Sequence, residues 1–138
     1  MLWTDHKEHK YIDEVGMMNV MFMISGKLVT PKLSTAILDG VTRDSILTLA
    51  KDMGVPTEER RVSIDELEAG FKDGTVSEAF GAGTAAVVAT IGCINIHGTN
   101  YDIKTPARDS FQVRVKEKLN EIRMGSASDK HNWNYVIG

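Results

Sequence analysis

The chain has 138 residues, of which 42% are hydrophobic and 25% are charged, so it can bury one modest core but not those of a large two-domain enzyme. Its net charge of −3, with lysines and arginines scattered along the sequence, argues against nucleic-acid binding. The single cysteine, Cys93, excludes an internal disulfide and a cysteine-based zinc site, and without a long apolar run or an apolar leader we expect a protein of the reducing cytoplasm, with no membrane association.

The first residues predict a buried strand. Met1 to Asp5 places an apolar residue, Trp3, where we expect a core position, and a charged segment follows directly. His6 and His9 are three residues apart and could meet on one helical turn, but no third or fourth metal ligand is evident nearby. We therefore expect a solvated turn here, not a metal site.

Glu14 lies shortly before an apolar run, residues 20–24, that predicts a buried strand. A carboxylate in this place is either an edge charge that faces water or a group held inside for a charged partner, because burying it unpaired is costly. The spacing favours the edge position. Ser25-Gly26-Lys27 then predicts a hairpin turn, and residues 28–30 form the partner strand, which Pro31 ends.

A first helix is predicted to begin at Val41, directly after Gly40, and to end at Gly54, with Thr42 or a neighbour expected to cap it. Gly40 precedes this helix, so the N-terminus presents unpaired backbone N–H groups and the positive end of the helix dipole, a possible anion site. Most helix N-termini bind only water. The apolar residues that follow the helical period are Ile46, Leu47, Leu49, Ala50 and Met53.

The middle of the chain predicts an edge strand and a second helix. Alternating charge marks residues 58–62 as the strand. Ser63 and Glu66 then form a capping box, which opens a short helix that Gly74 ends. Its buried stripe is Ile64, Leu67 and Phe71.

A glycine-rich stretch follows the predicted strand Val76 to Phe80. Gly81 to Ala85 predicts a sharp turn with little side-chain bulk, so a ligand could lie against its backbone amides, with the hydroxyl of Thr84 as a further donor. The run Ala85 to Ala89 suits a buried strand or a tightly packed helix start. A turn that only serves packing is the more common use of such glycines.

The last third predicts two short strands and a helix. Residues 91–96 and 101–103 pair across a turn at 97–100, and Thr105-Pro106 begins the helix, which ends at Gly125. Two aromatic residues in the tail, Trp133 and Tyr135, suggest that the tail docks on the domain. The core face of the helix is Phe111, Val115, Leu119 and Ile122.

Four segments carry a family resemblance: EVGMMNVMF (14–22), LVTPKLSTAILDGVTRDSILTLA (28–50), AFGAGTAAV (79–87) and LNEIRMG (119–125). In order and spacing they resemble the C-terminal half of branched-chain amino acid aminotransferases, fold-type IV enzymes that use pyridoxal 5'-phosphate. The resemblance implies that residues 1–138 form the large, cofactor-binding domain. It also implies a mixed α/β fold with a curved, barrel-like sheet and about three packed helices.

The resemblance gives several residues a role toward the cofactor. Glu14 matches the acid that pairs with the pyridine nitrogen, which replaces the edge-charge interpretation. Leu38 matches the apolar residue that packs against the ring face. The phosphate is expected at the helix start and the glycine stretch, held by Gly40, Val41 and Thr42 together with Gly83 and Thr84.

The same resemblance implies a substrate site and three departures from the family. The amides of Thr84 and Ala85 are similar to the pair that fixes the substrate carboxylate. Met17 stands where many members have threonine, which removes a polar contact near the ring. Ala86 and Ala89 stand where some animal members have two cysteines, so that redox switch is not expected here.

No catalytic residue is assigned in this chain, because the family's Schiff-base lysine, its phosphate-binding arginine and its small N-terminal domain are expected upstream of Met1. We therefore expect part of an enzyme of branched-chain amino acid metabolism that transfers an amino group between leucine, isoleucine or valine and 2-oxoglutarate, inactive by itself. Alternatives are a D-amino acid aminotransferase, an aminodeoxychorismate lyase, or a noncatalytic module that binds a phosphate ligand or a partner subunit. Apolar surface near Trp3 and on the methionine-rich strand predicts a homo-oligomer, expected to be a dimer.

Overall fold

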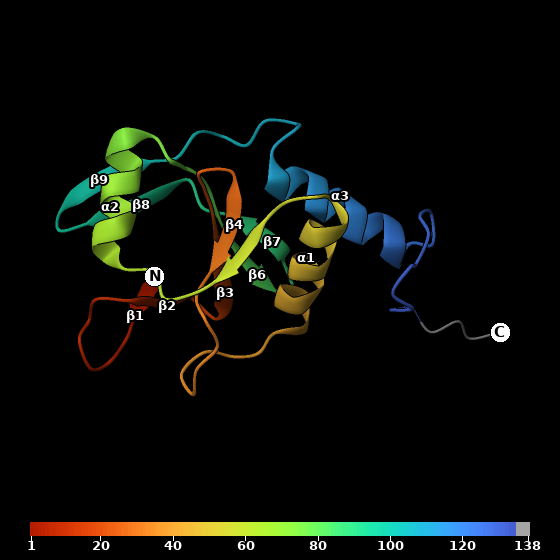
Figure 1. Cartoon of the computed structure of the whole chain (residues 1–138), viewed down its shortest axis with the longest axis horizontal. Coiled ribbons are helices and arrows are strands. Elements are labelled where there is room, and N and C mark those ends of the chain that lie inside the picture. Colours follow the sequence, from red (N-terminus) through yellow and green to blue (C-terminus); the bar gives the residue numbers. More distant parts are fainter. Residues whose placement is uncertain (135–138) are drawn as a thin grey trace.

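A computed structural model describes residues 1–134, which form three helices, a seven-stranded sheet and a separate two-stranded sheet (Figure 1). The helices are α1 (Val41–Asp52), α2 (Ile64–Asp73) and α3 (Phe111–Arg123). The large sheet contains β1 (Leu2–Thr4), β2 (Ile12–Val15), β3 (Met18–Ile24), β4 (Lys27–Thr30), β5 (Thr57–Glu59), β6 (Val76–Gly83) and β7 (Val87–Thr90). The small sheet pairs β8 (Cys93–Ile96) with β9 (Thr99–Asp102).

Strand β3 is the centre of the large sheet. One edge of β3 pairs with β6 along residues 19–24, and its other edge is shared between β2, at residues 18–19, and β4, at residues 22–24. All these pairs are antiparallel, whereas β5 adds to β4 in parallel. The α/β class with three helices is therefore confirmed, and the sheet is open, not a closed barrel.

The side chains of β3 alternate between two layers of the core. Met21 and Met23 point into the cluster that α1 and α3 complete, while Val20 and Phe22 point into the cluster under α2 and the β8–β9 sheet. Figure 1 shows α2 and β8–β9 on one side of the sheet and α1 with α3 on the other. Because this central strand is covered on both faces, the expectation that it adds apolar surface is wrong.

Trp3 is the opposite case, an expected core residue that is 52% exposed. Strand β1 is a short strand at the edge of the sheet, paired only with β2, so its outer face has no cover. The indole Nε1 donates a hydrogen bond to the carbonyl of Gly16 at 2.9 Å. The predicted turn after β1 is confirmed, and no group of three His, Cys, Asp or Glu side chains within residues 1–134 could hold a metal ion.

The glycine stretch does not turn where the sequence predicted. Strand β6 continues through Gly83, and the turn comprises residues 84–86, so the predicted turn at Gly81 is wrong. A Cβ atom on Gly81 or Gly83 would come within 2.9 or 2.8 Å of the Met18 side chain. Glycine is therefore required there for close packing of β6 on Met18, which confirms the packing role that the sequence left open.

The predicted start of α1 at Val41 is confirmed, but Thr42 does not cap this helix, and the predicted start of α3 is wrong. The N-cap of α1 is Gly40, which has no side chain to offer, and Thr42 instead donates its hydroxyl to the carbonyl of Gly83 at 3.3 Å. Helix α3 begins at Phe111 after the N-cap Ser110, later than Thr105-Pro106, because residues 107–110 form a turn of their own. The core face predicted for α3 is buried as expected.

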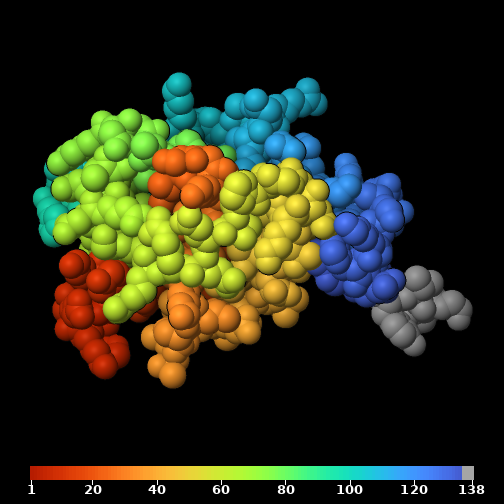
Figure 2. All heavy atoms as spheres, viewed as in Figure 1, coloured from red at the N-terminus to blue at the C-terminus, as the bar shows by residue number. Residues whose placement is uncertain are grey.

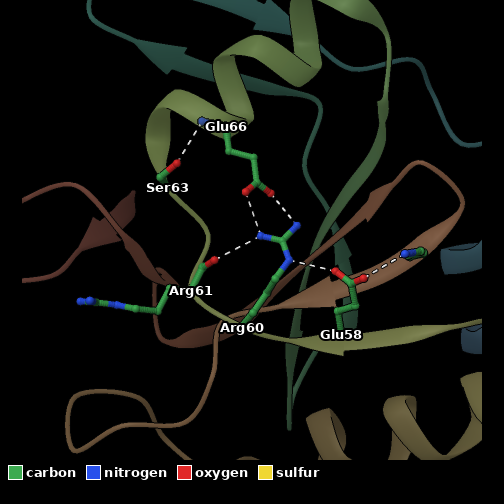
Figure 3. A network of polar contacts seen from close by, with 6 residues as sticks. Glu58, Arg60, Arg61, Ser63 and Glu66 are labelled. Carbon is green, nitrogen blue, oxygen red and sulfur yellow. Dashed lines mark hydrogen bonds and ion pairs between the residues drawn. The ribbon is translucent and has the colours of Figure 1, made fainter.

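Helix α2 begins and ends where its local signals predicted. The Ser63 hydroxyl accepts a hydrogen bond from the Glu66 N–H at 3.1 Å, and Gly74 ends the helix in the left-handed conformation, with φ of 80°. The Glu66 carboxylate, however, does not return to Ser63: it accepts two hydrogen bonds from Arg60, at 2.6 and 2.8 Å (Figure 3). Arg60 also donates to Glu58 on β5 at 2.9 Å, so the network ties α2 to the sheet edge.

The β1–β2 hairpin and the loop before α1 project side by side from one edge of the molecule, in red and orange in Figure 2. Between them lies a hollow of about 310 Å³, which none of the predicted site residues lines. The tail after α3 is described as far as residue 134, so the predicted docking through Tyr135 lies outside the described residues. The three helices are all too short or too polar to span a membrane, as far as the chain is described.

The Asp5 carboxylate is expected to make stability depend on pH in the acid range. It accepts hydrogen bonds from the backbone N–H groups of Tyr11, Glu8 and Lys10, at 2.8, 2.7 and 2.8 Å, and these bonds hold the pKa of Asp5 below its ordinary value. Because the folded-state pKa is depressed, the stabilisation is complete above the unfolded-state pKa of about 3.9 and is lost as the pH falls toward the folded-state pKa. Urea unfolding should therefore show a free energy that falls more steeply below about pH 4 in the wild type than in Asp5→Asn. The exposed Asp109 provides the control Asp109→Asn, which should follow the wild type, and equal slopes for Asp5→Asn and the wild type would contradict the prediction.

Candidate functional site

The residues predicted to form a site are brought together at one end of the large sheet. Glu14 on β2 is paired with Asn19 on β3, and Asn19 is paired in turn with Ala82 on β6. The loop Leu38–Gly40 and the start of α1 lie against these strand ends, through the contacts described below. Three neighbouring strands and one helix N-terminus therefore meet at this place.

The Glu14 carboxylate faces the loop before α1. Its Oε1 accepts a hydrogen bond from the backbone N–H of Leu38 at 2.9 Å. Within residues 1–134 no ion pair involves Glu14, and its second oxygen, Oε2, has no hydrogen bond. Glu14 is thus oriented by the backbone, with one oxygen left for another partner.

The N-terminus of α1 is open to an anion. Gly40 is the N-cap in an extended conformation (φ −74°, ψ 138°), and no side chain accepts a hydrogen bond from the first turn. Val41, the first helical residue, is 84% exposed. The N–H groups of the first turn and the positive end of the helix dipole can therefore bind an anion there.

The turn after β6 lies beside this helix start. A hollow of about 490 Å³ is lined on one side by Val41, Thr42, Ser45, Thr84 and Val87, and on the other by residues of α3 and the tail, including Arg123 and Trp133. The hydrogen bond from Thr42 to Gly83 holds the helix start against the end of β6. Three of the residues predicted to bind the phosphate, Val41, Thr42 and Thr84, therefore line one hollow.

The other predicted residues do not line this hollow: Glu14, Leu38, Gly40, Gly83 and Ala85. Thr84 and Ala85 are exposed in the turn, and the β-branched Val87 directly after it has a φ of 60°, a strained conformation for such a residue. Within residues 1–134 no lysine lines the hollow. Arg123, which the sequence did not single out, is its cation.

Arg43 was also missed by sequence reasoning. Its side chain is 3% exposed and donates to the carbonyl of Pro31 at 3.2 Å and to Glu59 at 2.8 Å, which fixes α1 against the ends of β4 and β5. Its Nε has no hydrogen-bond partner in the described part of the chain. The signal was present in the helical period, because Arg43 precedes Ile46 and Leu47 by three and four residues and so shares their buried face.

Comparison with known proteins shows that this chain is similar to class IV aminotransferases. The family model described as amino-transferase class IV matches residues 5–94. The chain is similar to a probable branched-chain-amino-acid aminotransferase of Staphylococcus aureus (strain N315), with 41% identity over 137 residues, which are 99% of this chain and 38% of that protein. It is 42% identical over 137 residues to branched-chain-amino-acid transaminase 1 of Bacillus subtilis (strain 168), again covering 99% of this chain and 38% of that protein.

Solved structures of branched-chain aminotransferases share the fold of this chain. The branched-chain amino acid aminotransferase of Thermobaculum terrenum in its PLP form matches with a TM-score of 0.77 and 27% identity, over 96% of this chain and 39% of that one. The branched-chain aminotransferase of the thermophilic archaeon Thermoproteus uzoniensis, solved with norvaline, matches with a TM-score of 0.76 and 26% identity, over 96% of this chain and 39% of that one. The chain thus spans about two fifths of the length of the proteins that it matches.

Proposed function

This chain belongs to the class IV amino-transferase family, and we propose that it is the cofactor-binding part of a pyridoxal-phosphate-dependent branched-chain amino acid aminotransferase. The proposed reaction transfers an amino group between leucine, isoleucine or valine and 2-oxoglutarate. The relatives that the chain matches are branched-chain aminotransferases, which supports this choice of substrate over a D-amino acid or aminodeoxychorismate. Since the chain spans 38% of the two bacterial relatives, the activity of the whole enzyme is part of the proposal.

The main support for the proposal is the loop Leu38–Gly40. At one end of this loop lies the Glu14 carboxylate, which has one oxygen without a hydrogen bond, and at the other end lies the uncapped N-terminus of α1. Glu14 binds the Leu38 end of the loop through Oε1 and keeps Oε2 without a partner in the described residues. Gly40, at the other end, is the N-cap of α1 and has no side chain that could cap the helix. Pyridoxal phosphate has a basic ring nitrogen at one end and a phosphate at the other, so the residues present fit both of its polar ends.

When bound, pyridoxal phosphate supplies the electron-accepting ring that allows an amino acid to lose the proton on its α carbon. Glu14 would keep a proton on the ring nitrogen through its free oxygen, because an ionised carboxylate stabilises the charged form of a neighbouring base. Leu38, whose side chain is 70% exposed, would lie against the ring face and exclude water from it. The backbone N–H groups of Val41 and Thr42, with the Thr84 hydroxyl, would bind the phosphate.

The substrate carboxylate is assigned to the turn after β6. Thr84 and Ala85 are exposed there, so their backbone N–H groups are accessible to a ligand. Gly83 has no side chain to obstruct an approach from that side. Met17 is 94% exposed near Glu14, where it offers an apolar surface and no hydrogen bond to the ring or the substrate.

The proposal extends to the rest of the enzyme. Among the residues that the structure describes, no lysine lines the hollow at α1, which supports assigning the lysine that would bind the cofactor covalently to another part of the enzyme. Met17, Leu38 and Val41 leave apolar side chains exposed around the site, which supports a homodimer or a neighbouring domain as their cover. A cytoplasmic location is proposed because the one cysteine, Cys93, is free and exposed.

Titration of the pure chain with pyridoxal phosphate tests the proposal. We expect saturable binding with a stoichiometry of one, and about tenfold or more weaker binding of pyridoxal, which lacks the phosphate and its contacts at the α1 N-terminus. Borohydride reduction followed by intact mass and peptide mapping should show no stoichiometric adduct at a single lysine. Leucine with 2-oxoglutarate should give no turnover with this chain alone.

Opposite results in these titration, reduction and turnover experiments would each contradict one part of the proposal. Equal affinity for pyridoxal and pyridoxal phosphate would contradict the assignment of the phosphate to the α1 N-terminus. The absence of any binding would contradict the cofactor-binding function. A stoichiometric adduct at one of the chain's own lysines would contradict the assignment of that lysine to another part of the enzyme. Turnover of a D-amino acid by the longer enzyme, in preference to leucine, would contradict the substrate.

A further inference from the structure

Asn19 is a buried polar residue in an otherwise apolar stretch of the central strand. Its exposed fraction is 5%, and it is paired in register with Glu14 on one side and with Ala82 on the other. A buried amide needs hydrogen-bond partners, since an unsatisfied one destabilises the fold. Its partner is not in the sheet: Nδ2 donates to the carbonyl of Leu38 at 2.7 Å.

Residue 38 is therefore held from two adjacent strands. Glu14 on β2 accepts the N–H of Leu38 at 2.9 Å, and Asn19 on β3 donates to the carbonyl of the same residue at 2.7 Å. The Leu38 carbonyl also accepts the N–H of Gly40 at 3.0 Å. These three bonds fix the backbone of the loop from the residue that contacts Glu14 to the residue that begins α1.

The Asn19 side chain also limits how closely the Leu38–Gly40 loop can approach β3, as the packing of Gly40 shows. A Cβ atom on Gly40 would collide with Asn19 Oδ1, at a separation that real Cβ atoms do not show. The backbone of Gly40 has a φ of −74°, which any residue adopts, so glycine is needed here for space and not for conformation. The loop thus packs directly on the Asn19 amide.

We propose that Asn19 is a positioning residue for the cofactor: by holding the Leu38–Gly40 loop, it fixes the separation between the Glu14 carboxylate and the N-terminus of α1. The proposal rests on the proposed function, because it concerns the two groups assigned to the ring nitrogen and the phosphate. Asn19 itself does not contact the ligand in this assignment. A cofactor with two polar ends binds best to groups that are already held at a matching distance, since the protein then needs less ordering on binding.

The test compares Asn19→Leu with a matched variant of another buried polar residue on the neighbouring strand. Thr30 is 1% exposed and donates to the carbonyl of Val20 at 2.8 Å, but has no hydrogen bond to the loop. Thr30→Val therefore removes one buried hydrogen bond of the same kind. For Asn19→Leu we expect the dissociation constant of pyridoxal phosphate to rise by about tenfold or more, and for Thr30→Val by less than about twofold.

Amide hydrogen exchange of the unliganded chain supplies a readout that does not depend on the cofactor. In Asn19→Leu the N–H groups of Leu38 and Gly40 should lose protection, while those of β3 and β6 keep theirs. In Thr30→Val the loop amides should stay protected. A purely structural role of Asn19 would instead lower protection evenly across the sheet, and that result would overturn the proposal.

Two outcomes separate this proposal from the proposed function. If the wild-type chain binds pyridoxal phosphate and Asn19→Leu binds it equally well, only the positioning role is overturned. If the wild type does not bind it, the cofactor function fails first and the positioning role falls with it. If Asn19→Leu does not fold, Gly40→Ala takes its place: the new Cβ would push the loop away from the Asn19 amide, so the dissociation constant of pyridoxal phosphate should rise by about tenfold or more, and unchanged binding would overturn the proposal.

Discussion

Replacement of Glu14 by glutamine is expected to weaken binding of pyridoxal phosphate to the chain by about 30-fold or more, with little change in stability. Glutamine keeps the oxygen that accepts the Leu38 N–H, seen at 2.9 Å, so the loop before α1 should stay in place. It loses the negative charge that would face the protonated ring nitrogen. Hydrogen bonds between charged groups are roughly twice as strong as neutral ones, so this change removes the strongest single contact assigned to the ring.

The measurement is a titration of both proteins with pyridoxal phosphate and with inorganic phosphate. Affinity for inorganic phosphate should be the same in Glu14→Gln and in the wild type, because the phosphate is assigned to α1. An exposed carboxylate on α3 provides the control Glu117→Gln, which should bind both ligands as the wild type does. Unchanged affinity of Glu14→Gln for pyridoxal phosphate would remove Glu14 from the site.

Replacement of Glu78 by alanine is expected to destabilise the fold by about 3 kcal/mol. Glu78 lies on β6, is 9% exposed, and accepts the backbone N–H groups of Phe111 and Gln112, each at 3.0 Å. The N-cap residue of α3, Ser110, accepts no hydrogen bond through its side chain. The Glu78 carboxylate, on the distant strand β6, caps the helix instead. Alanine would leave two buried N–H groups without an acceptor and remove a negative charge from the positive end of the helix dipole.

Urea denaturation of Glu78→Ala and Glu78→Gln separates these two contributions. Glutamine keeps one carbonyl oxygen as an acceptor but no charge, so it should cost about half as much as alanine. The exposed Glu117 again provides a control, since Glu117→Ala should stay within about 0.5 kcal/mol of the wild type. Equal stability of Glu78→Ala and the wild type would show that the α3 N-terminus does not depend on Glu78.

The resemblance and the local patterns anticipated most of the fold. Helix α2 begins at Ser63 and ends at Gly74 as predicted, because both signals are hydrogen bonds or dihedral preferences within one helical turn. The hairpin between β3 and β4 and the core face of α3 follow from equally local rules. The residues assigned to the cofactor by the family resemblance do lie together at one end of the sheet.

The pairings that connect distant segments could be seen only in the assembled fold. Glu14 meets Leu38 across 24 residues and Glu78 meets Phe111 across 33, and no periodicity encodes which carboxylate will reach which backbone N–H. The glycines of β6 look like a turn in the sequence, yet they lie in a strand because Met18, on the neighbouring strand, occupies the space of their missing side chains.

Local sequence signals thus specify the position of the α2 cap and the apolar faces of the helices, since each depends on residues within about one turn, whereas the class of fold followed from the family resemblance. The order of strands around β3 determines which faces are covered, and this is why Trp3 is exposed and the methionines at 21 and 23 are buried. The same strand order brings Glu14 and Asn19 side by side under one loop. Long-range contacts of this kind depend on how the whole chain packs, so they appear only when the sheet has formed.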